Sequence, residues 1–188
     1  MNDVDVGLVA RARAGDERAL DELLRAIMPL VRNVCRKTLN NTADADDATQ
    51  VALIKVVRGL GRFDSRSSFT TWVYRVATNA ALDEGRRRQR RGLRAVDTEQ
   101  ESVDPSSSVP HDRIADADEL TPLLRHIPEE FRVALVLRDI MDLDYDSIAE
   151  ILDVPGGTVR SRIARGRARL AELLGNQIPA PERHNPDQ

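Results

Sequence analysis

The sequence predicts an all-α protein made of two small helical domains joined by a flexible linker. Apolar residues recur at the spacing of helix faces on both sides of a polar, acidic stretch, which Pro105 and Pro110 interrupt. Aromatic residues make up only 3% of the 188 residues, so the helical cores must be built mainly from Leu, Ile, Val and Ala. The predicted boundaries are residues 1–92 for the first domain, 93–118 for the linker, 119–175 for the second domain and 176–188 for a disordered tail.

The first domain is expected to open with two or three helices over residues 4–39. Gly15 marks a break, and Asp16 is the expected N-cap of the helix that follows. Pro29 should kink or restart this helix, because proline lacks the N–H group that a helix interior uses. The apolar stripe of this region consists of Leu20, Leu23, Leu24, Ile27, Leu30, Val31 and Val34.

A further helix is expected over residues 44–60, with acidic side chains at its N-terminal end, where they complement the helix dipole. The side chains predicted to pack inward are Ala48, Val51, Ala52 and Val56. Asp47, Gln50 and Leu53 are then candidates for the outer surface. From the residues alone, the preferred interpretation of these acids is the bland one, ordinary residues of a helix N-terminus.

A polar loop over residues 62–68 precedes a long helix that begins near Phe69. One flank of this helix carries Trp72, Arg75, Asn79, Asp83 and Arg86, a set that could stack on and hydrogen-bond unpaired bases. Trp72 taken alone is more often the edge of a core. Asn79 is harder to explain by packing, because asparagine is disfavoured inside a helix without a partner. The block of residues 86–91 is either a solvated helix end or a phosphate contact.

The second domain is expected to hold two short helices followed by a helix-turn-helix. The motif comprises a helix over residues 145–152, a turn with Pro155 and two glycines, and a helix that begins at Thr158 as N-cap. Arginines flank a crest of small residues on the second helix, an arrangement that can enter a major groove and grip phosphates. The crest is Ser161, Ala164 and Ala168, and the arginines are Arg160, Arg162, Arg165, Arg167 and Arg169. The alternative is a solvated helix that happens to be rich in arginine.

The net charge of −3 is unusual for a protein that binds DNA alone, because affinity for duplex comes largely from neutralising phosphates. The charges are segregated, with arginine concentrated in residues 86–94 and 160–169 and acids concentrated elsewhere. The chain is therefore expected to bind DNA weakly by itself and to need a partner.

No catalytic residue, metal site or cofactor is expected. Three histidines and one cysteine are too dispersed for a zinc site, and Cys35 reads as a small core hydrophobe. Four acids fit the spacing of a calcium loop, but Ser147 stands where that loop needs glycine. These acids are expected to be turn and capping residues; they are Asp142, Asp144, Asp146 and Asp153. No apolar run is long enough to span a bilayer and the N-terminus lacks signal-peptide features, so a cytoplasmic protein is expected.

Three segments, in order along the chain, resemble regions 2.2, 2.3 to 2.4 and 4 of the extracytoplasmic-function sigma factors of bacterial RNA polymerase. They are DADDATQVALIKVVRGLGRFD, SFTTWVYRVATNAALDEGRRRQRR and IPEEFRVALVLRDIMDLDYDSIAEILDVPGGTVRSRIARGRARL. The resemblance implies a non-enzymatic initiation factor that binds core polymerase and recognises and opens promoters. Its implied partners are the clamp helices of the largest polymerase subunit, the polymerase flap and promoter DNA, with an anti-sigma factor as a candidate regulator.

The resemblance also implies site residues. The polymerase-binding set is Asp46, Asp47, Gln50 and Leu53, which reverses the bland interpretation of these acids. The set implied for the minus-ten element is Asp64, Ser65, Ser68, Trp72, Arg75, Asn79, Arg86 and Arg87. The set implied for the minus-thirty-five element is Thr158, Arg160, Ser161, Arg162, Ala164 and Arg165.

The chain departs from the family pattern at Val51, where glutamate is frequent, at Gly85, where an apolar residue is usual, and at Ala164, where many members carry an aromatic residue or histidine. Two other classes stay open. A dimeric operator-binding regulator would leave the first ninety or so residues without a role, and an interaction adaptor would leave the arginine-rich helix unexplained. A sigma factor of this kind is expected to be monomeric when free and to have no membrane contact.

Overall fold

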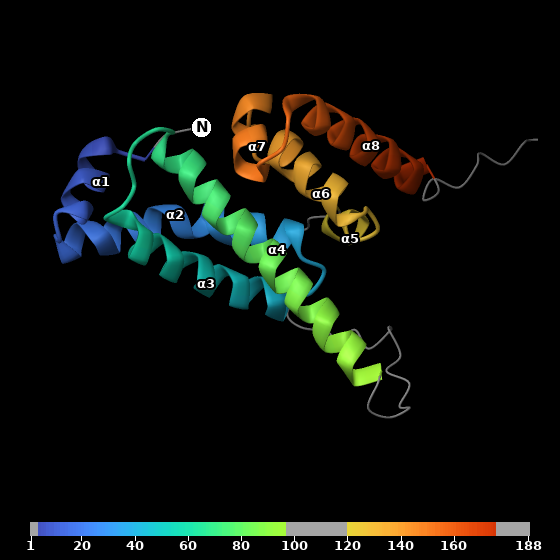
Figure 1. Ribbon diagram of the computed structural model, residues 1–188, viewed down its shortest axis with the longest axis horizontal. Helices are drawn as coiled ribbons and strands as arrows, with labels where there is room; N and C mark the ends of the chain where they lie inside the picture. The colour runs from blue at the N-terminus through green and yellow to red at the C-terminus, as the bar shows by residue number, and fades with distance from the viewer. Residues whose placement is uncertain (1–3, 97–119, 176–188) are drawn as a thin grey trace, which may run out of the picture.

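The computed structural model describes residues 4–96 and 120–175, and every regular element in these two stretches is helical (Figure 1). The N-terminal half, residues 4–96, holds α1 (Val6–Arg13), α2 (Glu17–Thr38), α3 (Thr42–Leu60) and α4 (Phe69–Val96). The C-terminal half, residues 120–175, holds α5 (Leu120–Leu124), α6 (Glu129–Leu135), the π-helical turn η1 (Val136–Ile140), α7 (Tyr145–Leu152) and α8 (Gly156–Gly175). The all-α prediction with two helical domains is confirmed.

The expected linker and tail fall largely outside the described residues. The predicted boundary between the first domain and the linker lies at residues 92 and 93, and α4 continues across it from Gly92 to Val96. No helix within the described part of the chain is both long and apolar enough to cross a membrane.

The N-terminal half is a bundle of α2, α3 and α4 with α1 packed on α2. Leu23, Ile27 and Val31 on α2 are fully buried, which follows from their spacing on one face. The predicted cap is confirmed, because the Asp16 side chain accepts hydrogen bonds from the backbone N–H groups of residues 18 and 19 at 3.0 and 3.1 Å. Of the kink or restart expected at Pro29, the restart does not occur, because α2 runs through this position as one helix of 22 residues. Buried residues on both sides of Pro29 hold the two parts of α2 on the same core, which offsets the lost hydrogen bond.

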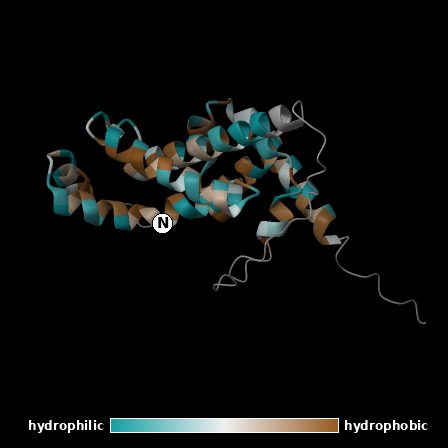
Figure 2. Ribbon diagram, turned by 90° about the horizontal axis from the view of Figure 1, so that it is seen from below, coloured by the Kyte–Doolittle hydropathy of each residue, from teal (hydrophilic) through white to brown (hydrophobic). Residues whose placement is uncertain are grey.

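Helix α3 begins two residues before its predicted start, with Asn41 as N-cap. Ala48, Ala52 and Val56 are buried as predicted, but Val51 is 37% exposed. The inward expectation for Val51 is wrong because the buried positions of α3 recur at intervals of three and four residues, and Val51 lies outside that stripe. Figure 2 shows the resulting alternation of hydrophobic and hydrophilic segments along the helices.

In the C-terminal half α8 lies across α6, and the two helices approach closely at Gly166. The helix-turn-helix of α7 and α8 is present, with Asp144 capping α7 and Asp153 ending it in a left-handed conformation at φ 52°. The N-cap predicted at Thr158 is wrong, because α8 already begins at Gly156. The Pro155 carbonyl accepts from the N–H groups of Thr158 and Val159 at 2.8 and 3.2 Å, so Thr158 lies inside the first turn.

The two halves are in contact, and α7 packs on α4 (Figure 1). An ion pair joins Arg75 on α4 to Glu150 on α7. On the other side of the contact, Arg132 Nη1 on α6 donates to Asn40 Oδ1 at 2.8 Å. We refer to this packing of the two halves as the closed arrangement.

Candidate nucleic-acid and protein interfaces

The N-terminal part of α8 presents most of its predicted DNA-contacting residues to solvent. Arg160, Ser161, Ala164 and Arg165 are exposed, and Arg162 and Thr158 are half-buried. Val159 and Ile163, on the opposite side of α8, are buried at 0% and 1% exposure. The amphipathic pattern therefore fixes which side of the helix can meet a ligand.

Two aromatic side chains that sequence reasoning missed lie behind these arginines. The Arg160 guanidinium is 6.0 Å from the centre of the Tyr145 ring, and that of Arg165 is 5.6 Å from the centre of the Phe131 ring. Arg138 lies over the same Tyr145 ring at 5.2 Å. Such cation–π contacts restrain a guanidinium without neutralising it. The only sequence signal for these two contacts was that Tyr145 and Phe131 are among the few aromatic residues of the chain.

The C-terminal part of α8 differs, because its arginines are paired with acids. Arg167 makes two hydrogen bonds to the Asp139 carboxylate, at 2.8 and 2.6 Å, which raises the pKa of the guanidinium. Arg169 pairs with Glu172 at 2.8 Å. Within the described residues Arg160, Arg162 and Arg165 have no carboxylate partner, so the arginine charge available to an anion lies in the first half of α8.

On α4 the predicted flank separates into residues with structural partners and one without. Trp72 is half-buried and packs against the rings of Phe63 and Phe69, with centroid distances of 5.4 and 5.6 Å. A Cβ at Gly59 would come within 2.9 Å of the indole, so the ring also fits closely against α3. Asn79 is exposed and has no hydrogen-bond partner among the residues that the structure describes. The interpretation of Trp72 as the edge of a core is thus supported. The side-chain amide of Asn79 has no structural role among the described residues that would explain its place in the helix.

The loop before α4 has its own internal contacts. Asp64 pairs with Arg66 at 2.9 Å, and Ser65 has a left-handed backbone with φ 60°. The Ser68 hydroxyl accepts from the Thr71 N–H at 3.0 Å and so caps α4. Asp64 and Ser65 are exposed beside this cap.

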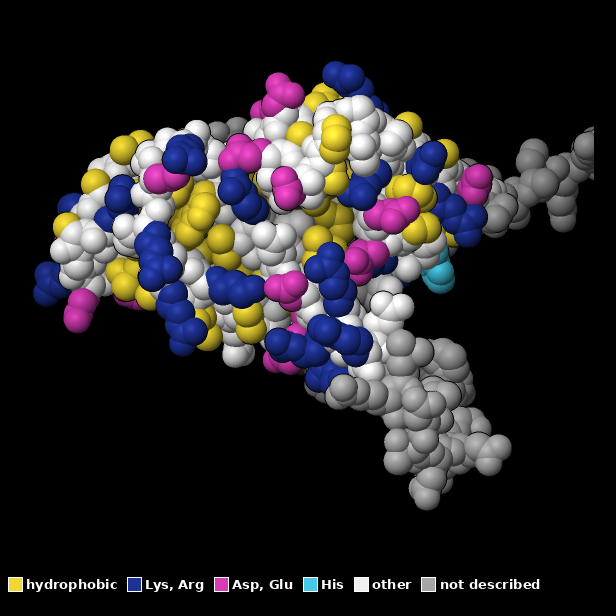
Figure 3. All heavy atoms as spheres, viewed as in Figure 1, with side chains coloured by type: hydrophobic (Ala, Val, Ile, Leu, Met, Phe, Trp, Pro, Cys, Tyr) yellow, Lys and Arg dark blue, Asp and Glu magenta, His cyan; other side chains and the backbone are white. Residues whose placement is uncertain are grey.

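The arginine block at the end of α4 is partly neutralised, which the sequence reading missed. Arg87 and Arg91 pair with Glu84 at 3.1 and 2.5 Å, and Glu84 is only 5% exposed. Arg88 pairs with Asp44 on α3, and Arg86 lies 3.7 Å from a neighbouring carboxylate. Figure 3 shows these arginine side chains gathered beside acidic ones over the C-terminal part of α4. The sequence signal that was missed is the position of Glu84, which lies one helical turn before Arg87 and two turns before Arg91.

The outer side of α3 carries an exposed apolar patch next to its predicted polar residues. Asp47 and Gln50 are exposed, while Asp46 and Leu53 are half-buried at the edges of this side. We define the α3 patch as Val51, Ile54 and Val57, whose exposed fractions are 37%, 49% and 40%. An apolar stripe flanked by polar residues marks a protein interface more often than a solvated surface. The sequence reading missed Ile54 and Val57.

The acids of the calcium-like spacing have turn and capping roles, as predicted. Asp144 Oδ1 accepts from the Ser147 N–H at 2.7 Å, and this bond with a second one from the Ser147 hydroxyl lowers the pKa of Asp144. Asp142 has a left-handed backbone with φ 54°.

Cys35 is buried, and burial raises the pKa of its thiol to about 11. Its prediction as a core residue is confirmed.

Two family models match the chain. Sigma-70 region 2 matches residues 23–91, and Sigma-70, region 4 matches residues 117–170. The chain is 34% identical to the RNA polymerase sigma-H factor of Pseudomonas aeruginosa over 182 residues, which covers 90% of this chain and 93% of that protein. It is 34% identical to the ECF RNA polymerase sigma-E factor of Escherichia coli K12, covering 93% and 94% of the two chains. With the ECF RNA polymerase sigma factor SigM of Mycobacterium tuberculosis the identity is 36%, covering 91% and 85%.

Two solved structures share the fold. The sigma factor RpoE of Bartonella quintana, in complex with the anti-sigma factor NepR, aligns with a TM-score of 0.67 at 23% identity, covering 84% of this chain and 98% of that one. CnrH, in complex with the cytosolic domain of CnrY, aligns with a TM-score of 0.66 at 23% identity, covering 91% and 97%.

Proposed function

We propose a division of roles between the two halves of this chain, which belongs to the extracytoplasmic-function family of RNA polymerase sigma factors. The chain is a sigma factor that directs promoter-specific transcription initiation. In our proposal the N-terminal half binds core polymerase and engages the minus-ten element, and the C-terminal half reads the minus-thirty-five element. It acts by binding, without chemistry of its own, in the cytoplasm where polymerase works. The observation that carries the proposal is the set of unpaired arginines on α8, presented by a helix-turn-helix.

The core polymerase contact is proposed for the outer side of α3. The predicted residues Asp46, Asp47, Gln50 and Leu53 surround the α3 patch, whose apolar side chains lack a partner within the described chain. The proposed occupant is the clamp-helix pair of the largest polymerase subunit, while the C-terminal half would approach the flap. Apolar residues at the centre of an interface carry much of its binding energy.

The α3 contact can be tested with Ile54→Glu. We expect core polymerase affinity to fall at least about tenfold, because a charge would be desolvated at the centre of the interface. Val6→Glu is the matched control, since Val6 is 78% exposed on α1, away from this surface. Equal loss in both variants would refute the assignment of α3.

The minus-thirty-five contact is proposed for Thr158, Arg160, Ser161, Arg162, Ala164 and Arg165. Arg160→Ala or Arg165→Ala should cost about 1 to 3 kcal/mol of binding if the guanidinium makes a bidentate base contact. Arg169→Ala is the control, because Arg169 is already paired with Glu172. Loss that is equal on all promoter sequences would mean that the arginine holds a phosphate and does not read a base.

The minus-ten contact is proposed for Asp64, Ser65, Ser68, Trp72, Arg75, Asn79, Arg86 and Arg87. Within this set Asn79 is the sharpest test, because it is exposed and has no partner among the described residues. Asn79→Ala should impair promoter opening, followed by permanganate reactivity of unpaired thymines, more than it impairs polymerase binding. Equal impairment of both would assign Asn79 a structural role.

The whole proposal is tested by adding the chain to core polymerase on promoter DNA. We expect specific initiation with polymerase and weak binding to duplex DNA without it. Tight, polymerase-independent binding to duplex would instead favour a conventional operator-binding regulator. Because the Bartonella quintana sigma factor of similar fold was solved in complex with an anti-sigma factor, we also propose an anti-sigma factor as a partner of this chain, to be sought by co-purification with the products of adjacent genes.

A further inference from the structure

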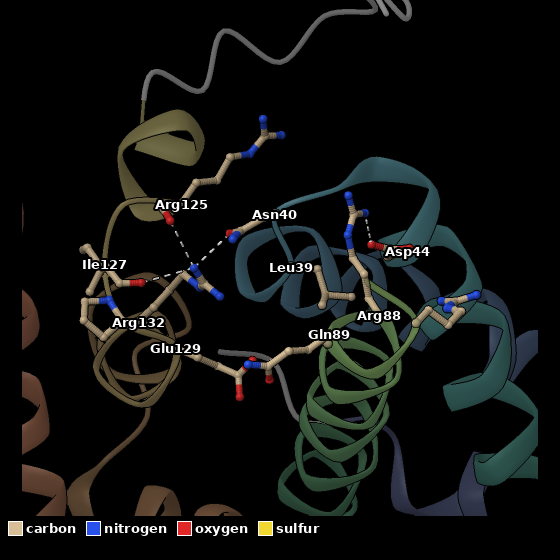
Figure 4. A pocket seen from close by; sticks show the side chains of 12 residues that line it. Leu39, Asn40, Asp44, Arg88, Gln89, Arg125, Ile127, Glu129 and Arg132 are labelled. Atoms are coloured by element: carbon tan, nitrogen blue, oxygen red, sulfur yellow. Dashed lines mark hydrogen bonds and ion pairs between the residues drawn. The ribbon is translucent and has the colours of Figure 1, made fainter. Parts of the chain in front are cut away.

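A pocket of about 920 Å³ lies at the junction of the two halves (Figure 4). One wall comes from the connection between α2 and α3, the start of α3 and the C-terminal part of α4, and the other comes from the connection between α5 and α6 and from α6 itself. Its charged lining consists of Arg88, Arg91, Arg125, Arg132, Asp44 and Glu129. Both halves must therefore be in the closed arrangement for the pocket to exist.

The charges of this lining do not balance. Arg88 pairs with Asp44 across the first wall, and Arg91 pairs with Glu84, outside the pocket. Arg125 on the opposite wall is exposed and has no side-chain partner among the described residues. An anion entering the pocket would therefore meet at least one guanidinium that is free to bind it.

Arg132 is a second source of uncompensated positive charge, and it is only 5% exposed. Its Nη1 group donates to the Asn40 side chain at 2.8 Å and to the Ile127 carbonyl at 3.2 Å, which are both neutral acceptors. Its Nε is buried without a hydrogen-bond partner, and no carboxylate of the described chain lies within ion-pair distance. Burial lowers the pKa of this guanidinium, with partial opposition from the Glu129 charge. Buried charges in proteins are normally paired with an opposite charge, which Arg132 lacks.

We propose that this pocket binds an oligophosphate anion, held between Arg125 and Arg132 of the C-terminal half and Arg88 of the N-terminal half. Guanidinium groups favour phosphate because their planar N–H groups can form two parallel hydrogen bonds to its oxygens. The volume exceeds what a single phosphate fills and lies within the range of nucleotide-sized ligand pockets. The ligand class is therefore a chain of two or more phosphates, either free or carried by a nucleotide.

The position of the pocket gives the ligand a consequence for conformation. A ligand that contacts both walls binds the closed arrangement and stabilises it over any arrangement in which the halves separate. A change that lowers the population of the closed arrangement must lower the apparent affinity for the ligand in proportion to that population.

Glu129 allows a second test of the proposal, in which removal of a charge should strengthen anion binding. This exposed carboxylate lines the pocket and points toward its centre, near Gln89 (Figure 4). It repels an anion, while Arg125 attracts one. Removing one charge or the other should therefore change affinity in opposite directions, which a general loss of stability cannot do.

The experiment titrates inorganic tripolyphosphate into the full-length protein by calorimetry, with ionic strength held constant by sodium chloride. We expect one saturable site, about fivefold weaker binding for Arg125→Gln, and binding strengthened roughly threefold for Glu129→Gln, from the loss of a nearby charge in each case. Arg13→Gln, an exposed arginine on α1 outside the pocket, is the matched control and should stay within about twofold. Absence of saturable binding, or equal weakening by Arg125→Gln and Arg13→Gln, would overturn the proposal.

Two further measurements test the dependence on closure and the source of the phosphate chain. Glu150→Arg breaks the distant ion pair of the closed arrangement without touching the pocket, so it should weaken tripolyphosphate binding; unchanged affinity would overturn the dependence on closure. ATP without metal, compared with tripolyphosphate, identifies the source: tighter binding of ATP assigns the site to a nucleotide, and equal binding assigns it to the phosphate chain. None of these measurements involves polymerase or promoter DNA, so their failure would leave the proposed transcription function untouched.

Discussion

Gly166 offers a direct test of how α8 is held against α6. A Cβ added at this position would lie 3.0 Å from the Phe131 carbonyl oxygen and 3.2 Å from Leu135 Cβ. Both neighbours belong to α6, and since one is a backbone oxygen and the other a Cβ, neither is the free end of a flexible side chain. Gly166→Ala should therefore force α8 and α6 apart by a few tenths of an ångström.

The size of the effect is a difference of two terms. Replacing glycine by alanine inside a helix favours folding by about 1 kcal/mol. Overpacking of a tight contact costs about 1 to 3 kcal/mol, and backbone atoms place this case in the middle of that range or above. The net expectation is a destabilisation of about 1 kcal/mol. Gly157→Ala is the matched control, because nothing lies within 4 Å of its added Cβ and it should be neutral or slightly stabilising.

The assay is urea denaturation of the full-length variants, followed by circular dichroism. A loss of 1 kcal/mol lowers the midpoint by about 0.3 to 1 M for the slopes usual in small proteins. If Gly166→Ala raised the midpoint as Gly157→Ala does, the close approach of α8 to α6 would not be a fixed contact. In that case the placement of Arg165 over the Phe131 ring would lose its structural basis.

Three other outcomes are expected. Cys35, buried and with its pKa raised to about 11, should react with iodoacetamide at pH 8 only as the chain unfolds, and rapid labelling of native protein would contradict its core position. Asp144→Ala should cost about 1 kcal/mol through the lost cap. Because the Ser147 hydrogen bonds lower the pKa of Asp144, this contribution is present above the unfolded value near 3.9 and disappears as pH falls through the lower folded value; parallel acid curves for the two proteins would refute it. Arg75→Glu should expand the molecule in small-angle scattering and the added Glu150→Arg should reverse the expansion, unless their ion pair does not hold the halves together.

Local patterns in the sequence were sufficient to predict most of the helices. The Asp16 cap and the helix-turn-helix could be predicted because each depends on residues that are close together in the chain. Val51 was misplaced because an apolar residue in a helical pattern is usually buried, and in α3 the apolar pattern continues onto a side with no partner in this chain. The Thr158 cap failed for a local reason, since the Pro155 carbonyl starts the helix two residues earlier.

The contacts between the halves could not be predicted in this way. Arg75 and Glu150 are separated by 75 residues, and Arg132 and Asn40 by 92, so no periodicity links them. Glu84 is a different case: its pairing with Arg87 and Arg91 follows from local helical spacing, whereas its burial depends on the packing around α4. Sequence reasoning thus proposed which side chains could meet DNA, but it could not tell which of them already have partners in the folded chain.

On the proposed assignment, the closed arrangement cannot be the one that reads a promoter. The minus-ten and minus-thirty-five elements are about 25 base pairs apart, which is roughly 85 Å of duplex at 3.4 Å per pair. In the structure α7, the partner of α8 in the helix-turn-helix, contacts α4 directly through Glu150 and Arg75. Residues 97–119, 23 in number, can span at most about 80 Å when fully extended, which together with the size of the two halves is enough to reach both elements. Promoter binding therefore requires α7 to leave α4, and any ligand or partner that binds only the closed arrangement must oppose initiation, by a free energy that grows with its concentration relative to its dissociation constant.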